Sequence, residues 1–226
     1  ANLPYTIPAK FVDQQCGSSM AGIQIGFMEI AQEFADVVLC AGYEHMTRVA
    51  MGMSNVEKGL LAPNMTLFLN PEYQHWDIMT SMNMGLTAEK LTAQSKIARK
   101  EMDQWGARSH QLAAQARSQG FFKDEILPIE AVQADGSMLR VDTDQAMRDD
   151  ATYEGMAELK PAFKKDGVIT PGNSSPLNAG ATAMILMSKE TAKKKGIRPL
   201  ATIRSIGFAG VDPTVMGAGP VPASRK

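Results

Sequence analysis

Apolar residues recur at three- and four-residue spacing near the start of the chain, and a short, continuous apolar run follows them. The spacing predicts a helix with one buried face made of Met20, Ile23, Phe27, Ile30, Ala31 and Phe34. Residues 37–41 are all apolar and lie between Asp36 and Gly42, a pattern typical of a strand in a parallel sheet covered on both faces. Together with the extended residues ahead of the helix, they predict a strand–helix–strand unit with a right-handed crossover.

The pattern breaks over residues 46–83, where Gly, Pro, Asn and Met interrupt every period. Irregular segments of this length in compact proteins are usually functional or lid-like. Helical periodicity returns over residues 86–97, with Thr87 as a candidate cap, and over residues 100–118, with Gly120 as a candidate C-cap.

Extended or strand-like patterns make up most of the remainder. They cover residues 125–132, 138–141, 181–187 and 200–208. A turn at Asp135-Gly136 joins the first two. Ser188 is placed to cap a lysine-rich helix over residues 189–195, and Gly196 to end it. The predicted fold class is therefore α/β, a mostly parallel sheet with helices on both faces, interrupted by a long inserted segment.

Composition narrows the function classes. The 226 residues carry a net charge of −1, without the basic stripe that nucleic-acid binding requires. We identify no secretory signal and no apolar run long enough to span a membrane, so we expect a cytoplasmic protein whose two cysteines are reduced. The three histidines are scattered, and we expect no metal site. The 16 methionines favour core filling over the alternative of an adaptable apolar pocket.

Cys16 is the leading candidate for chemistry. It lies where an extended stretch turns into the first helix, and the N-terminus of a helix stabilises a thiolate. Gly17, Ser18 and Ser19 keep the turn small and offer capping hydroxyls. A thiol placed in this way can act as a nucleophile. The alternative interpretation is a small, buried apolar cysteine.

Other segments have both a functional and an ordinary interpretation. Residues 173–180 are dense in turn formers that could present hydroxyls and backbone N–H groups to a ligand, or that could form a simple polar turn. Glu44 and His45 follow a predicted strand and could act on a substrate, although local hydrogen bonds explain His45 as well.

Several motifs along the chain, taken in their order, resemble those of the thiolase family, and the resemblance covers essentially the whole chain. The resemblance rests on residues 13–21 around Cys16, the Gly-x-Glu-x-Met loop at 42–46, Met-Gly-x-Thr-Ala-Glu at 84–89, Arg-Ser-His-Gln at 108–111, the loops at 159–163 and 170–180, and the Gly/Pro run at 212–224. It implies part of the thiolase fold, with residues 1–45 in the nucleophile domain, 46–170 as an inserted loop domain that binds coenzyme A, 171–198 as the return to the first domain, and 199–226 as the start of a second.

The resemblance also implies an acyltransferase of the 3-ketoacyl-CoA thiolase or acetyl-CoA acetyltransferase type. Cys16 matches the nucleophile, and its backbone N–H helps to form an oxyanion hole. Met84, Phe163 and Ser175 match residues that line the coenzyme A site, and the spacing to Phe163 puts Arg148 where a cation meets the nucleotide. Coenzyme A and acyl-CoA are implied as substrates, with no covalently bound cofactor, in a homodimer or homotetramer that acts in lipid metabolism such as fatty acid β-oxidation.

Two departures from the family pattern qualify this interpretation. Asp13 replaces the usual Asn, and a carboxylate there disfavours a thiolate unless a cation compensates. Asn83 stands where some short-chain members have His. The family's catalytic histidine, in a Gly-His-Pro motif, and its second cysteine match nothing here, so we expect the central part of a longer thiolase. The alternatives are an inactive coenzyme A- or lipid-binding module and a non-functional fragment.

Overall fold

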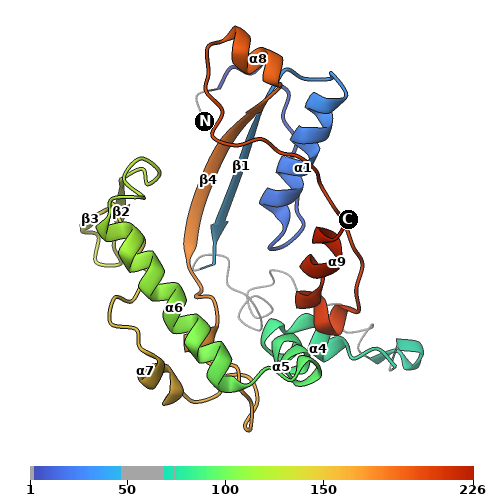
Figure 1. Cartoon of the computed structure of the whole chain (residues 1–226), viewed down its shortest axis with the longest axis vertical. Helices are drawn as coiled ribbons and strands as arrows, with labels where there is room; N and C mark the ends of the chain where they lie inside the picture. Colours follow the sequence, from blue (N-terminus) through green and yellow to red (C-terminus); the bar gives the residue numbers. More distant parts are fainter. Residues whose placement is uncertain (1–2, 47–68, 74) are drawn as a thin grey trace. The chain divides into compact units, whose positions relative to one another are not determined.

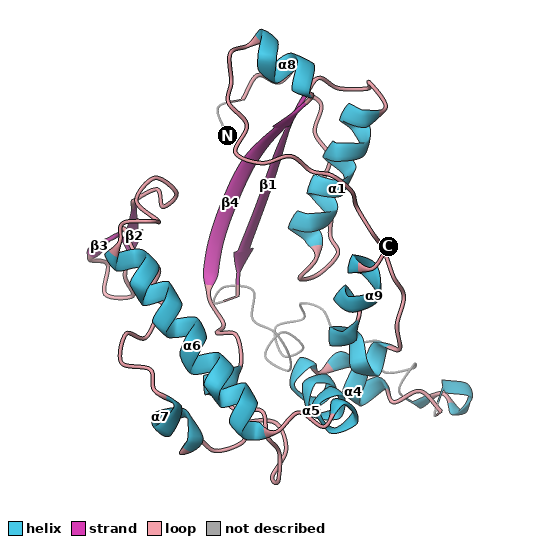
Figure 2. Cartoon of the chain, in the orientation of Figure 1, coloured by secondary structure: helices cyan, strands magenta, loops and turns pink. Residues whose placement is uncertain are grey.

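The computed structural model describes residues 3–46, 69–73 and 75–226, which divide between two compact units (Figure 1). Unit 1 comprises the described parts of Ala1–Leu61 and Leu177–Phe208, and unit 2 those of Ala62–Pro176 and Ala209–Lys226. Helices and strands are mixed along the chain (Figure 2). Residues 47–68 of the predicted irregular segment lie outside the described residues. Within the described part, no helix is both long and apolar enough to cross a bilayer.

Unit 1 is built on a two-stranded antiparallel sheet. Strand β1 (Val37–His45) pairs with β4 (Ala179–Met187) along the whole length of both strands. The prediction of a parallel arrangement is therefore wrong for this pair. The Met46 N–H donates to the Asn178 carbonyl oxygen at 3.3 Å, so the intervening segment leaves and returns at the same end of the sheet. A chain that re-enters at that end must run back along β1.

Helix α1 (Ser18–Ala31) packs on this sheet through small residues. Ala21 and Gly26 are its buried positions, and an ideal Cβ at Gly26 would lie 3.1 Å from the Sγ of Cys40 in β1. The predicted buried face is wrong, because none of its six residues is buried. Met20 is 66% exposed, Ala31 is exposed, and Phe34, beyond the end of α1, is 83% exposed. Close approach of the helix to the sheet selects small side chains rather than the large apolar ones.

Burial alternates along β1, which shows that only one face of the strand is covered. Cys40 is buried against α1, whereas Val37 and Leu39 on the other face are 43% and 50% exposed. The expectation of a strand covered on both faces is therefore wrong within unit 1. A continuous apolar run shows that a strand can be buried on two sides, but the covering elements must come from elsewhere in the fold.

Two other predicted strands do not form in the described part of the chain. Ahead of α1 there is only an isolated bridge between Gln14 and Cys16, so the crossover unit lacks its first strand. Residues 200–208 contain no strand, and Leu200 is fully exposed. An extended segment becomes a strand only when its backbone groups pair with a neighbouring strand. The alternation of apolar and polar residues in the sequence does not show whether such a neighbour exists.

The predicted helix after β4 is confirmed. Helix α8 (Lys189–Lys194) begins at Ser188, whose Oγ accepts a hydrogen bond from the Thr191 N–H at 3.0 Å. Gly196, just beyond the helix, adopts a φ of +66° that suits glycine.

One part of unit 2 packs short helices around α5 (Met84–Ser95). Helices α4 (Ile78–Met82) and η3 (Pro213–Ala218) contact α5 and each other, and α9 (Pro220–Ser224) contacts η3. A short 3₁₀ helix, η1 (Pro71–Tyr73), precedes α4. The helix predicted over 86–97 is confirmed, but its cap is Asn83, whose Oδ1 accepts the Leu86 N–H at 3.1 Å. Thr87, the predicted cap, is instead buried and donates its hydroxyl to the Met84 carbonyl.

The other part of unit 2 is organised by the long helix α6 (Arg99–Ser118), as predicted for residues 100–118. It packs against α7 (Tyr153–Ala157) and η2 (Pro171–Asn173). Gly120 ends α6 with a φ of +73°. The predicted extended pair forms an antiparallel hairpin, although residues 125–128 of the first predicted segment are not part of its strand. Its strands are β2 (Ile129–Val132) and β3 (Met138–Val141).

Helix α6 and η2 approach each other closely at Gly106, where an ideal Cβ would lie 2.5 Å from the Gly172 carbonyl oxygen. We predict that Gly106→Ala lowers the free energy of unfolding by about 1–2 kcal/mol, because overpacking outweighs the better helix propensity of alanine. Urea denaturation of the chain measures the change.

The matched control is Gly22→Ala in α1, where an ideal Cβ meets nothing within 4 Å. This variant should raise stability by up to about 1 kcal/mol through helix propensity alone. A similar gain for Gly106→Ala would contradict the close backbone approach.

Candidate functional site

Cys16 lies in unit 1, immediately before Gly17, the N-cap residue of α1. Its side chain is exposed. The Ser18 hydroxyl does not cap the helix as expected. It accepts the Gln14 N–H at 2.8 Å and donates to the Gln15 carbonyl at 2.7 Å. The first turn of α1 has no side-chain cap. The Gly17 and Ser18 N–H groups donate to the Gln14 and Gln15 carbonyls at 3.0 and 3.1 Å, so the positive end of the helix dipole lies beside an accessible thiol while these two donors are already used.

The start of α1 is held beside the carboxyl end of β1. An ideal Cβ at Gly42 would lie only 1.9 Å from the Ser19 Oγ, so a larger residue at this position of β1 would push the helix away. Cys16 therefore belongs to a turn anchored near the end of a strand, where functional groups of α/β proteins commonly gather.

Asp13 takes part in the same turn. Its Oδ1 accepts the Gln15 N–H at 3.1 Å. Asp13 precedes Cys16 by three residues, and Gln15 directly precedes it. The side-chain oxygen of an Asn could accept the same bond. Asp at this position is thus compatible with the turn geometry, and the substitution adds a negative charge without removing this hydrogen bond.

Cys40 has a different environment. It is buried between α1 and β1, and its Sγ donates to the Gly22 carbonyl at 3.5 Å. Burial raises the pKa of the Cys40 thiol, and the negative charge of Glu29 raises it further. Burial also hinders access by reagents, so Cys40 is a packing residue and Cys16 the candidate nucleophile of unit 1.

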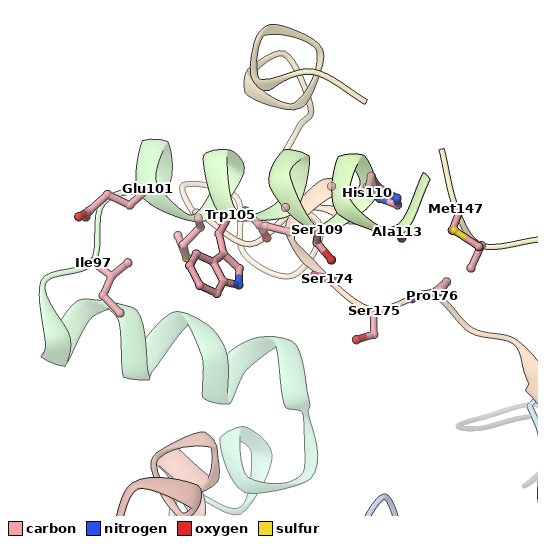
Figure 3. Close-up of a pocket in the computed structure, with 15 residues that line it drawn as sticks. Ile97, Glu101, Trp105, Ser109, His110, Ala113, Met147, Ser174, Ser175 and Pro176 are labelled. Carbon is pink, nitrogen blue, oxygen red and sulfur yellow. The ribbon is translucent and has the colours of Figure 1, made fainter. Parts of the chain in front are cut away.

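A cavity of about 670 Å³ opens in unit 2 between one face of α6 and the segment that follows η2 (Figure 3). Trp105, Ser109 and His110 line it from α6, and Ser174 and Ser175 line it from the other side. Ser175, one of the predicted site residues, therefore faces a space large enough for part of a ligand. The Arg108 guanidinium carbon lies 4.8 Å from the centre of the exposed Trp105 ring, as in a cation–π pair.

Arg148 lies at the rim of this cavity. It directly follows the lining residue Met147, and its backbone N–H donates to His110 Nδ1 at 3.2 Å. His110 thus carries its ring proton on Nε2 when neutral. The Arg148 side chain is exposed, which leaves the guanidinium accessible to an anionic ligand.

Phe163 lies against Gly85 at the start of α5, the residue that directly follows Met84. An ideal Cβ at Gly85 would lie 2.1 Å from Phe163 Cγ and 2.2 Å from Cδ1, so the ring lies directly on the glycine. Phe163 is 44% exposed and Met84 46% exposed. Their apolar surfaces are therefore available for contact with a flexible, partly apolar ligand.

A buried ionic network holds the cavity wall in place. The carboxylate of Asp103, only 1% exposed, pairs with Arg99 one turn earlier in α6 and accepts the Asn173 Nδ2–H at 3.0 Å. The Asn173 Oδ1 in turn accepts the N–H of the fully buried Thr170 at 2.8 Å. Arg99 also donates to the carbonyls of Met156 and Leu159. The network fixes η2, and with it the position from which Ser175 enters the cavity.

The predicted site residues therefore form three groups. Cys16 belongs to unit 1, Ser175 and Arg148 border the cavity of unit 2, and Met84 and Phe163 gather at α5. In residues 3–46, 69–73 and 75–226, no three His, Cys, Asp or Glu side chains are placed to hold a metal ion. The catalytic role of Cys16 and the binding roles of Met84, Arg148, Phe163 and Ser175 remain predictions.

Sequence reasoning missed several residues that shape the cavity. Trp105 was not singled out, although Glu101, Trp105, Ser109 and Ala113 recur at four-residue spacing on one face of α6, a periodicity that could have identified it. Ser109 and His110 were noted only as part of the motif at 108–111 and were not assigned to a site. The network of Asp103 and Asn173 had no such signal, because its members are polar, are 70 residues apart and follow no period.

Comparison with known proteins identifies the family. A family model described as the N-terminal domain of thiolase matches residues 1–190. The 3-ketoacyl-CoA thiolase of Stutzerimonas stutzeri is 41% identical over 225 residues, which cover 99% of this chain and 54% of that protein. The chain thus spans about half the length of this curated relative.

Solved structures show the same similarity. The acetyl-CoA acetyltransferase of Bacillus anthracis is 37% identical with a TM-score of 0.79, over 98% of this chain and 56% of its own. The dimeric peroxisomal thiolase of Saccharomyces cerevisiae is 31% identical with a TM-score of 0.84, over 99% of this chain and 55% of its own.

The buried network gives a stability prediction. Asp103→Ala removes the carboxylate that pairs with the Arg99 guanidinium and accepts one Asn173 Nδ2 hydrogen bond, so it leaves a partly buried cation without its counter-charge. The variant should lower the free energy of unfolding by about 2–4 kcal/mol in urea denaturation. Asp149→Ala is the control, because it breaks an exposed ion pair between α6 Arg117 and Asp149. This loss should stay below about 1 kcal/mol, and equal losses in the two variants would refute the structural role of Asp103.

The two cysteines should differ in reactivity. We predict that iodoacetamide modifies Cys16 at least about tenfold faster than Cys40 in the folded chain, because Cys40 is buried and its pKa is raised. Peptide mass spectrometry at several reaction times measures both rates, and urea-unfolded chain provides the control in which the rates should converge. Equal rates in the folded chain would contradict the described burial.

Proposed function

The chain belongs to the thiolase family, as its ordered motifs predict, and on that premise we propose that it carries the nucleophile and most of the coenzyme A site of an acyl-CoA:acetyl-CoA acyltransferase. The observation that carries this proposal is the exposed thiol of Cys16, set directly before the uncapped first turn of a 14-residue helix. That placement leaves the thiol where a substrate can reach it, beside the positive end of a helix dipole.

The proposed reaction proceeds through an acyl-enzyme on Cys16. The thiolate attacks the keto carbonyl of a 3-ketoacyl-CoA, and backbone N–H groups stabilise the oxyanion that forms. The carbon–carbon bond then breaks, and the departing acetyl-CoA carbanion takes up a proton. A second coenzyme A thiol accepts the acyl group and restores the cysteine. The reverse sequence is a Claisen condensation that joins two acyl units.

We assign coenzyme A binding to the described surfaces of unit 2. Met84 and Phe163 offer adjacent apolar surface to the pantetheine chain, and Ser175 offers a hydroxyl from the wall of the cavity. Arg148 offers an exposed cation to the phosphates of the nucleotide part. Coenzyme A acts here as a substrate that binds and leaves, with no resident cofactor.

The general base is assigned to no residue of this chain. His110 is engaged in unit 2 through Nδ1, and none of the three histidines matches the family's catalytic motif. Because the chain spans about half the length of the relatives it matches, we propose that full turnover needs residues beyond those matched here. A nucleophile without its base loses most of its rate advantage.

We also propose that the complete protein assembles from identical subunits, as a dimer or a dimer of dimers. The similarity to a yeast thiolase described as dimeric supports this proposal. The exposed apolar side chains of β4, Met184 at 47% and Ile185 at 62%, are consistent with a sheet that gains further contacts in an assembly.

Acylation of Cys16 tests the proposal. We predict that the chain, joined to the part of the Stutzerimonas stutzeri relative that lies beyond the matched region, gains one acetyl group per subunit when incubated with acetyl-CoA. Mass spectrometry of the intact protein and of its peptides should place that group on Cys16. The 226-residue chain alone should be acetylated far more slowly, because it lacks an assigned base.

The matched variants are Cys16→Ala, which should abolish acetylation, and Cys40→Ala, which should leave it unchanged. Acetylation that persists in Cys16→Ala would refute the nucleophile assignment. Binding of coenzyme A without any acetylation would support an inactive coenzyme A-binding module instead.

A further inference from the structure

Glu89 of α5 holds a loop by its backbone. Its Oε1 accepts the N–H groups of Val168 and Ile169, both at 2.9 Å, and its Oε2 accepts the Val168 N–H at 3.1 Å. Hydrogen bonds to an ionised carboxylate are stronger than those between neutral groups. Among the described residues, the N–H groups of these two loop residues have no strand or helix partner. The Glu89 side chain accepts them instead and so anchors the loop on α5.

The anchored residues close the loop that carries Phe163. The Ala162 N–H donates to the Ile169 carbonyl at 2.9 Å, which joins the two ends of the loop. Between them, a turn is closed by the Gly167 N–H and the Lys164 carbonyl at 3.0 Å. Fixing Val168 and Ile169 to α5 therefore fixes the segment from which the Phe163 ring extends.

The ring itself rests on the same helix one turn earlier. Gly85 and Glu89 are four residues apart, so they share one face of α5. Gly85 accepts the flat contact of the Phe163 ring, and Glu89 holds the returning end of the loop. Two anchors on one helix face thus define the orientation of a ring that is 44% exposed and available to a ligand.

We propose that Glu89 is a positioning residue for coenzyme A binding, which acts by holding the Phe163 ring in the orientation that contacts the pantetheine chain. This inference rests on the proposed function of Phe163. A carboxylate suits the role because it presents acceptors only, whereas an amide would turn an NH₂ group toward one of the N–H donors.

A double-mutant cycle tests this role. Coenzyme A is titrated by calorimetry into four proteins: the unaltered chain, Glu89→Gln, Phe163→Ala and the double variant. We expect Glu89→Gln to weaken binding about tenfold when Phe163 is present, and less than about twofold in the Phe163→Ala background. Loss of protection of the Val168 and Ile169 amides in hydrogen exchange should accompany the first change. Glu154→Gln, at an exposed position of α7, is the matched control and should bind as the unaltered chain does.

Each contrary result has a distinct meaning. An unaltered affinity in Glu89→Gln, or the same loss in both backgrounds, overturns the positioning role while leaving the proposed function intact. Failure of Glu89→Gln to fold, while Glu154→Gln folds, overturns it in favour of a purely structural role. Absence of coenzyme A binding by the unaltered chain contradicts the proposed function itself.

Discussion

A carboxylate taken out of water must be paired, and the buried Asp103 meets this requirement by binding three parts of unit 2 together. It pairs with Arg99 of its own helix, which reaches the carbonyls that end α7, and it accepts the Asn173 amide of η2. The segment that carries Ser175 leaves η2 directly after this contact. The wall of the cavity therefore depends on one desolvated ionic contact rather than on regular backbone pairing.

The neighbouring helix uses the same physical solution. Glu89 of α5 binds the backbone of Val168 and Ile169, while Asn173 donates to the Val168 carbonyl at 3.0 Å. Both polar anchors thus meet in one short stretch of chain, from which the Phe163 loop and the Ser175 segment diverge. Carboxylates on two helices therefore add side-chain anchors to this stretch, beyond the turns that its own backbone forms.

The sequence predicted the features that depend on local periodicity and capping, such as α6, the β2–β3 hairpin and the Ser188 cap of α8. It could not predict the direction of β4, because that depends on where a long inserted segment returns to the sheet. It overestimated the burial of Met20, since close packing of α1 favours small residues. Among the predicted site residues, Cys16 is exposed before α1 and Ser175 lines the cavity, and their roles remain predictions. The polar network behind Ser175 follows no period, so no sequence pattern indicated it.

We propose that the surfaces held by Asp103 and Glu89 bind coenzyme A. Backbone amide chemical shifts of the 24.4 kDa chain, recorded by NMR during titration with coenzyme A, test it most directly. We predict that the largest changes fall on residues 84–85, 163, 168–169 and 174–175. Changes concentrated instead on the lysine-rich helix α8, or the absence of any saturable change in unit 2, would contradict it.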